Sequence, residues 1–263
     1  MKLKYYQVDA FTESVFKGNP AGIIFSDLND ETLMQKIAFE NNLSETAFIS
    51  KKNNEYFIRW FTPYCEVDLC GHATLASAYI YFNHIDKNSN KFIVNSKSGY
   101  LNVTKNKDTF SLNFPADTID EVVSILPEID FFLGQKPDKI FKGRDDYLCI
   151  FDNETKVANL RPNFSSSTSI NSRGIIASAK SNKYDFVSRC FFPQAGVNED
   201  PVTGSAHTTL IPYWSKILNK TSLIAKQISQ RGGILECELE NDRVIISGKA
   251  VLFLEGEITL NSY

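Results

Sequence analysis

Two short stretches in different halves of the chain decide how it folds. Residues 56–63 read YFIRWFTP, and residues 185–193 read DFVSRCFFP. Both contain Arg-x-Phe-x-Pro, which starts at Arg59 in the first stretch and at Arg189 in the second. A repeat of this kind predicts that one structural unit occurs twice.

The sequence around the two motifs repeats as well. Apolar strand-like segments precede them, TAFIS at 46–50 and GIIAS at 174–178. A glycine and a run typical of a helix follow them, in CGHATLA at 70–76 and TGSAHTT at 203–209. Because strand, motif, glycine and helix recur in one order, the sequence predicts two duplicated halves.

The chain has 263 residues, of which 43% are apolar and 22% charged, as in ordinary globular proteins. We expect an α+β fold with one half at residues 1–116 and the other at 117–263, divided at the sequence PADT (115–118). The path of the last strand is left open, because it could return to the first half.

Periodicity and turn residues predict the elements. We expect strands at 3–10, 22–25, 46–50, 56–61, 91–95, 100–104, 109–114, 146–151, 174–178, 185–192, 223–229, 235–240 and 243–260. We expect helices after Asn29 or Asp30, after Gly71 to about Phe82, at 119–126 with Pro127 ending it, and at 205–218.

Composition excludes several classes of partner. The net charge is -3 without a block of Lys or Arg, so neither nucleic acid nor an anionic membrane is expected. No signal peptide and no long apolar span is seen. The five cysteines are an odd, scattered set, which favours a reducing, cytoplasmic location over a disulfide framework.

The two glycine turns are candidates for ligand binding. A helix start leaves backbone N–H groups unpaired and carries partial positive charge, so it suits a carboxylate or phosphate. Taken alone, Gly71 or Gly204 could simply make a tight turn. Two such turns in related halves indicate a shared ligand site.

Titratable groups gather at these turns, since two of the three histidines, His72 and His207, lie there. A general acid or base must ionise near neutral pH. Glu45 could do so if burial raised its pKa, although composition alone favours a helix cap or a solvated turn carboxylate. The Cys65–Cys70–His72 spacing does not fit zinc, and no nucleotide-binding motif is present, so no cofactor or metal is expected.

Three segments together resemble the phenazine-biosynthesis F-like (PhzF-like) family, relatives of diaminopimelate epimerase. They are QVDAFT…FKGNPAG (7–22), LSETAF (43–48) with RWFTPYCEVDLCGHATLA (59–76), and EDPVTGSAH (199–207). The similarity runs along the whole chain.

The resemblance implies two similar halves, each a strongly curved, mostly antiparallel sheet around a central helix, with the site in the cleft between them. It also implies cofactor-free isomerase chemistry on a small carboxylate-bearing metabolite, and a homodimer. Glu45 then corresponds to the acid/base that moves a proton, supported by His72, Asp200 and Ser205. The residues assigned to substrate binding are Asn19, Cys70, Gly71, Thr203 and Gly204.

The sequence also departs from its relatives. The epimerases use two opposed cysteines, whereas here Cys70 faces a position that corresponds to Thr203, which cannot form a thiolate. A racemase that uses Cys70 with Glu45 is the alternative enzyme, and a non-catalytic small-molecule binding protein is the alternative outside enzymes. The sequence does not identify the substrate.

Overall fold

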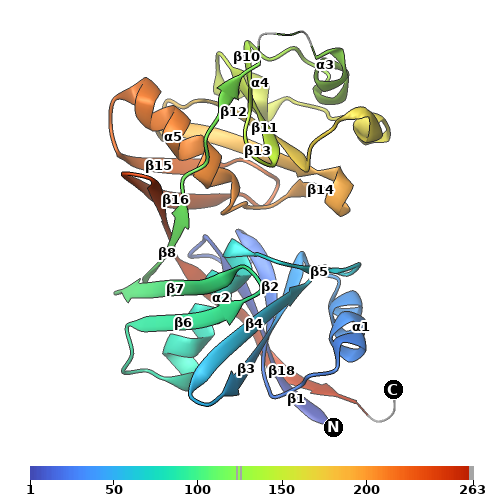
Figure 1. Ribbon diagram of the computed structural model, residues 1–263, viewed down its shortest axis with the longest axis vertical. Coiled ribbons are helices and arrows are strands. Elements are labelled where there is room, and N and C mark those ends of the chain that lie inside the picture. Colours follow the sequence, from blue (N-terminus) through green and yellow to red (C-terminus); the bar gives the residue numbers. More distant parts are fainter. Residues whose placement is uncertain (123, 125, 261–263) are drawn as a thin grey trace. The chain divides into compact units, whose positions relative to one another are not determined.

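The computed structural model describes residues 1–122, 124 and 126–260, with backbone alone at 168 and 169. The chain forms two compact units (Figure 1). The first comprises Met1–Asn113 and Ile246–Tyr263, and the second Phe114–Ile245. The division after Asn113 lies close to the expected seam at 116, but the second unit ends before the C-terminus.

The first unit contains two helices and a π-helical turn among its strands (Figure 1). Its elements are β1 (Lys2–Ala10), β2 (Asn19–Phe25), α1 (Glu31–Asn41), β3 (Glu45–Lys52), β4 (Glu55–Phe61), β5 (Glu66–Val67), α2 (Gly71–Ile80), η1 (Tyr81–Ile85), β6 (Lys91–Ser96), β7 (Gly99–Asn106), β8 (Thr109–Pro115) and β18 (Ala250–Thr259).

The second unit contains the remaining elements. They are β9 (Asp120–Glu121), α3 (Pro127–Leu133), β10 (Lys139–Lys142), β11 (Asp146–Phe151), α4 (Glu154–Ala158), η2 (Phe164–Ser169), β12 (Gly174–Lys180), β13 (Phe186–Phe192), η3 (Pro193–Ala195), β14 (Val197–Asp200), α5 (Ala206–Leu218), β15 (Ser222–Gln227), β16 (Gly233–Glu240) and β17 (Arg243–Gly248).

The helix predicted at 119–126 is wrong for its described residues. Strand β9 occupies Asp120–Glu121, while residues 123 and 125 lie outside the described part. Pro127 begins helix α3 instead of ending a helix. Proline suits the first helical position, because the N–H group that it lacks would have no partner there.

The strand pairings of the first unit recur in the second. The parallel pair β2–β3 corresponds to β11–β12, and the antiparallel pair β3–β4 to β12–β13. The parallel pair β4–β6 corresponds to β13–β15, and β6–β7 to β15–β16. Each Arg-x-Phe-x-Pro motif lies at the end of the middle strand, β4 or β13.

Each unit has one deeply buried helix, preceded by the predicted glycine turn. Helix α2 packs against β1, β2, β3, β7 and β18, and nearly all of its side chains are buried. Helix α5 packs against β15 and β16, and its Trp214 ring stacks on Phe186 of β13. No helix in the described residues is long and apolar enough to cross a membrane.

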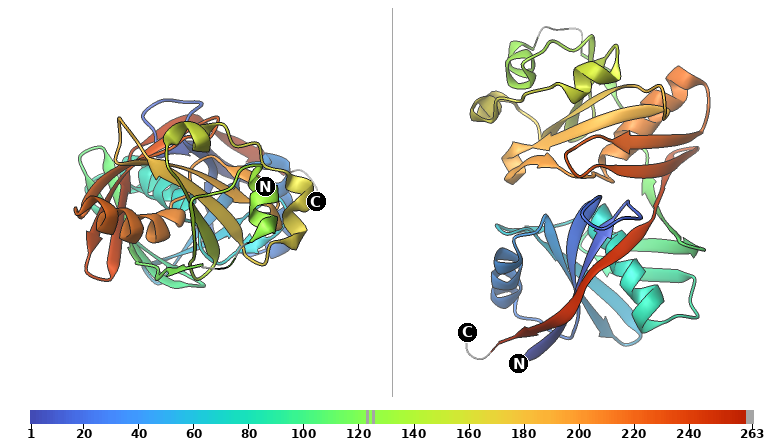
Figure 2. Two further views of the ribbon diagram at one scale, coloured as in Figure 1. Left: turned by 90° about the horizontal axis from the view of Figure 1, so that it is seen from above. Right: turned by 180° about the vertical axis from the view of Figure 1, so that it is seen from behind.

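The C-terminal strand returns to the first unit, the path that the sequence left open. Strand β18 pairs antiparallel with β1 from Lys2↔Thr259 to Ala10↔Ala250 (Figure 2). The two chain ends meet, since the Met1 amino group donates to the Leu260 carbonyl at 2.7 Å. The predicted single strand at 243–260 is therefore two strands, β17 and β18.

Candidate active site

Glu45 and His72 form the centre of the candidate site in the first unit. Oε2 of Glu45, at the start of β3, lies 3.1 Å from Nε2 of His72, in the first turn of α2. Their side chains are 16% and 6% exposed, so the carboxylate is sheltered but still reachable. Neither atom has a hydrogen-bond partner among the described residues, so the two groups are close without the alignment of a hydrogen bond.

Asn19 selects the tautomer that the neutral imidazole ring of His72 adopts. Its amide nitrogen lies 3.2 Å from Nδ1 of His72 and can only donate, so Nδ1 accepts and Nε2 carries the proton. The protonated nitrogen is therefore the one nearer to the Glu45 carboxylate. Gly18, which precedes Asn19, has a left-handed backbone conformation (φ +66°). A Cβ atom at position 18 would lie 2.1 Å from the Ala10 carbonyl oxygen, so the turn requires glycine.

The third group in the cluster is the buried thiol of Cys70. Its sulfur lies 3.5 Å from Nδ1 of His72. Burial, assisted by the charge of Glu45, raises the pKa of Cys70 to about 11, so it is a thiol at neutral pH. Burial lowers the pKa of His72, but Cys70 and Glu45 outweigh it and raise the pKa above its ordinary value.

The cluster does not have the geometry of a metal site, although one ligand atom each from Glu45, Cys70 and His72 lies within 4.8 Å of the others. Glu45 approaches Nε2 of the ring and Cys70 approaches Nδ1. Glu45 and Cys70 are therefore each nearest to a different nitrogen of the ring, whereas a metal ion would be bound through one of them.

The start of helix α2 offers backbone donors beside the cluster. Gly71 is the first helical residue, and the first N–H groups of any helix lack intrahelical acceptors. Cys70 at the cap position makes no side-chain capping bond. Gly71 does not have a positive φ, so backbone conformation alone does not require glycine there.

A second group of predicted residues comes together in the second unit. The Thr203 hydroxyl donates to Oδ2 of Asp200 at 2.5 Å. Gln227 of β15, fully buried, holds both ends of this turn: its Oε1 accepts from the Thr203 N–H at 2.8 Å, and its Nε2 donates to the Asp200 carbonyl at 2.7 Å.

Gln227 is not among the predicted site residues, although its place in β15 carries a signal. Leu223, Ala225 and Gln227 alternate on the buried side of β15, so a polar residue occupies an apolar register. A buried amide in such a register needs partners, which here are the residues of the predicted turn.

Ser205, Gly204 and His207 lie where helix α5 begins. Ser205 is the cap residue without a side-chain capping bond, and the Gly204 carbonyl accepts from the His207 N–H at 3.0 Å. His207 donates through Nδ1 to the Thr203 carbonyl at 2.8 Å. Burial lowers its pKa to about 4, so His207 is neutral and structural.

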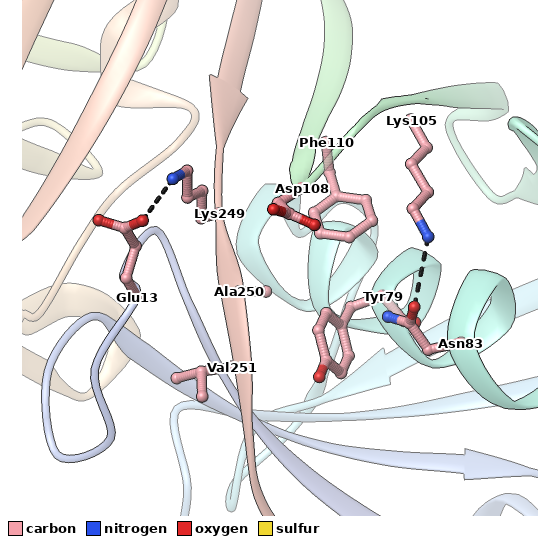
Figure 3. Close-up of a pocket in the computed structure, with 9 residues that line it drawn as sticks. All are labelled: Glu13, Tyr79, Asn83, Lys105, Asp108, Phe110, Lys249, Ala250 and Val251. Atoms are coloured by element: carbon pink, nitrogen blue, oxygen red, sulfur yellow. Dashed lines mark hydrogen bonds and ion pairs between the residues drawn. The ribbon is translucent and has the colours of Figure 1, made fainter.

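A separate pocket of the first unit does not contain these residues. It has a volume of about 320 Å³ and lies between α2, η1, the β7–β8 turn and β18 (Figure 3). Its cations have partners within the lining: Lys249 with Glu13, and Lys105 with the side-chain oxygen of Asn83 at 3.3 Å.

Comparison with known proteins identifies the relatives of this arrangement. The family described as phenazine biosynthesis-like protein matches residues 8–256. The chain belongs to this family. An uncharacterized isomerase of Pseudomonas aeruginosa is 46% identical over 99% of this chain and all of its own. A PhzF-family crystal structure from Enterococcus faecalis is 48% identical, with a TM-score of 0.95 over 99% of this chain and 100% of its own.

The epimerase-like fold and the isomerase class are thereby confirmed for this PhzF-family chain. A predicted epimerase of Pseudomonas aeruginosa superposes with a TM-score of 0.74 at 16% identity, covering 98% of this chain and 100% of its own. That likeness concerns the fold alone, whereas the isomerase class follows from the more similar relatives.

Proposed function

We propose that this isomerase works without a cofactor and that Glu45 moves a proton between two positions of a small carboxylate-bearing metabolite. The observation that carries the proposal is the Glu45–His72 pair, 3.1 Å apart and largely sheltered from water. A carboxylate in such a place is reachable by a substrate proton, while its orientation is fixed by a neighbouring group.

His72 has the role of a fixed partner. Nε2 carries a proton in the neutral tautomer that Asn19 selects, and also in the charged form. It therefore steadies the Glu45 carboxylate before proton transfer. The unpaired N–H groups at Gly71 and the start of α2 are suited to a substrate carboxylate or to negative charge that develops during the reaction.

Asp200, Thr203, Gly204 and Ser205 complete the proposed set as polar and substrate-binding residues of the second unit. The short Thr203–Asp200 bond and the buried Gln227 amide support this role, because they hold the turn in one conformation. The predicted cleft between the halves, the homodimer and the cytoplasmic location stay predictions.

The alternative use of Cys70 and Glu45 as an opposed pair is less well supported. An acid and a base on opposite faces of one carbon, each within hydrogen-bond reach, stand roughly 6 Å apart. Here one Glu45 oxygen and the Cys70 sulfur lie within 4.8 Å of each other, and both are beside the His72 ring. The raised pKa of Cys70 also keeps it a thiol.

Solvent exchange tests the proposal. Small carboxylic acids are incubated with the enzyme in D2O, and deuterium uptake at carbon is followed by NMR. Glu45→Gln should slow the exchange of any true substrate by about 10²–10⁴-fold, the usual contribution of a general acid or base. Cys70→Ala should leave it largely unchanged.

Glu55→Gln is the matched control, because Glu55 is an exposed carboxylate at the start of β4. Undiminished exchange in Glu45→Gln would remove Glu45 from the reaction. Loss in Cys70→Ala equal to that in Glu45→Gln would favour the two-base alternative.

A further inference from the structure

A second cavity of the first unit lies apart from the Glu45–His72 pair. Its volume is about 390 Å³, within the range of small-molecule sites. It opens beside α1, between the ends of β3, β4 and β6. Its lining is formed by Ser26, Leu28, Asn29, Met34, Phe48, Ser50, Lys52, Phe57, Ile58, Arg59, Asn95, Ser96 and Lys97.

The described lining is cationic. Lys52, Arg59 and Lys97 belong to it and no carboxylate does. From outside the lining, Glu66 binds both Arg59 and Lys97, and the exposed Glu31 also binds Arg59 at 2.6 Å. Lys52 has no ion pair within the described chain. The pocket of Figure 3 differs in this respect, because Glu13 and Asp108 there accompany its lysines.

The repeat supplies an internal comparison for Arg59. Arg59 and Arg189 make the same two-pronged bond to Glu66 and Glu199, with Nε distances of 2.7 Å in both. Nη1 of Arg189 also donates to backbone carbonyls at the end of α4, including that of Leu160 at 3.0 Å. Among the described residues Nη1 of Arg59 has no partner, so a guanidinium donor stays available at the cavity.

The corresponding face of the second unit is filled by protein. Phe48 is opposite Arg59 in the sheet, as Ala177 is opposite Arg189. Over Ala177 lies an apolar cluster that includes Phe132 of α3. In the first unit helix α1 covers part of this side, since its Leu33 and Met34 share an apolar cluster with Phe48. The cavity opens on this side of the sheet beside α1, with Met34 and Phe48 in its lining.

From these observations we propose that the cavity binds a small organic anion with an apolar body, such as an aromatic or branched carboxylate. The apolar body would lie against Met34, Phe48 and Phe57. The anionic group would be bound by Lys52, Lys97 and the free donor of Arg59. This site is separate from the proposed catalytic one and does not depend on its assignment.

Binding of 3-phenylpropionate to the full chain tests the site, with 3-phenylpropanamide as the neutral control and inorganic phosphate as an anion without an apolar body. Isothermal titration gives affinities, and amide NMR shifts give the location. We expect the carboxylate to bind more tightly than either control and to shift Phe48, Ser50 and Ile58. Lys52→Gln and Lys97→Gln should each weaken it about three- to fivefold.

Lys51→Gln is the matched control, because Lys51 is the adjacent exposed residue of β3 and points to the opposite face of the sheet. The Lys51→Gln variant should bind 3-phenylpropionate as tightly as the wild type does. The His72→Gln variant should do so as well. The proposal is overturned if the amide binds as well as the carboxylate, if Lys51→Gln weakens binding as much as Lys52→Gln, or if His72→Gln abolishes binding and the shifts.

Discussion

Gln227 shows how a single buried amide can organise a functional turn. Its side chain is fully buried, and it exchanges hydrogen bonds with both Asp200 and Thr203. The turn sequence itself could be recognised before the structure was known, but its support could not. Gln227 lies far along the chain, and only the pairing of β13 with β15 brings it to the turn.

Removing this amide should destabilise the protein. Gln227→Leu leaves the Thr203 N–H and the Asp200 carbonyl without their partner in a buried place, and should lower the free energy of unfolding by about 2–3 kcal/mol. Urea titration measures the loss. Gln35→Leu, which removes one half-buried bond to the Thr62 carbonyl, is the control and should cost about 1 kcal/mol or less.

His207 should make folding sensitive to acid. Its folded pKa of about 4 lies below the ordinary value of 6.5, so between these values the unfolded chain binds more protons. Stability is therefore full above about pH 6.5 and falls as the pH drops towards 4, by ~3 kcal/mol for this group. Denaturant midpoints of the wild type and His207→Gln across this range measure it, and equal pH slopes would contradict it.

The sequence predicted that helix α1 begins after one of two residues, Asn29 or Asp30. The structure selects Asp30, because its Oδ1 accepts from the Leu33 N–H at 3.1 Å. The apolar spacing also predicted the buried face of this helix correctly. Helices α3 and α4 were not found, because they are only a few residues long and carry too few periodic positions.

The cap of α1 predicts a measurable contribution. Asp30→Ala should lower the free energy of unfolding by about 1 kcal/mol, since a helix N–H loses its acceptor. Thermal and urea unfolding measure the change. Asn29→Ala should have little effect, and an equal loss in both variants would show that the cap is not the cause.

At the scale of the whole molecule, the repeat was visible in sequence because its motif has a structural task. Arg59 and Arg189 each lie over the ring two residues on, Phe61 or Phe191, with 5.1 Å from guanidinium carbon to ring centre in both. The path of the C-terminal strand could not be predicted, because it depends on an unpaired edge of β1 and not on its own sequence.

The repeated arginines predict unequal effects. Arg189→Lys should destabilise more than Arg59→Lys, by about 1–2 kcal/mol, because Nη1 of Arg189 also donates to the carbonyls of α4. Urea unfolding of the two variants and the wild type measures the difference between the two losses in the free energy of unfolding. Equal losses would mean that these carbonyl bonds contribute no more than the ion pair of Arg59 with the exposed Glu31.

The return of β18 to β1 has a consequence for biosynthesis. Every residue of the second unit precedes Ala250–Thr259 in the chain, and the first unit lacks its last strand until that segment is available. The second unit, although it starts later in the sequence, is thus the first of the two whose chain is complete. Until β18 pairs, the nascent chain carries an open edge along Lys2–Ala10, and this stretch is where a chaperone or a neighbouring nascent chain would attach.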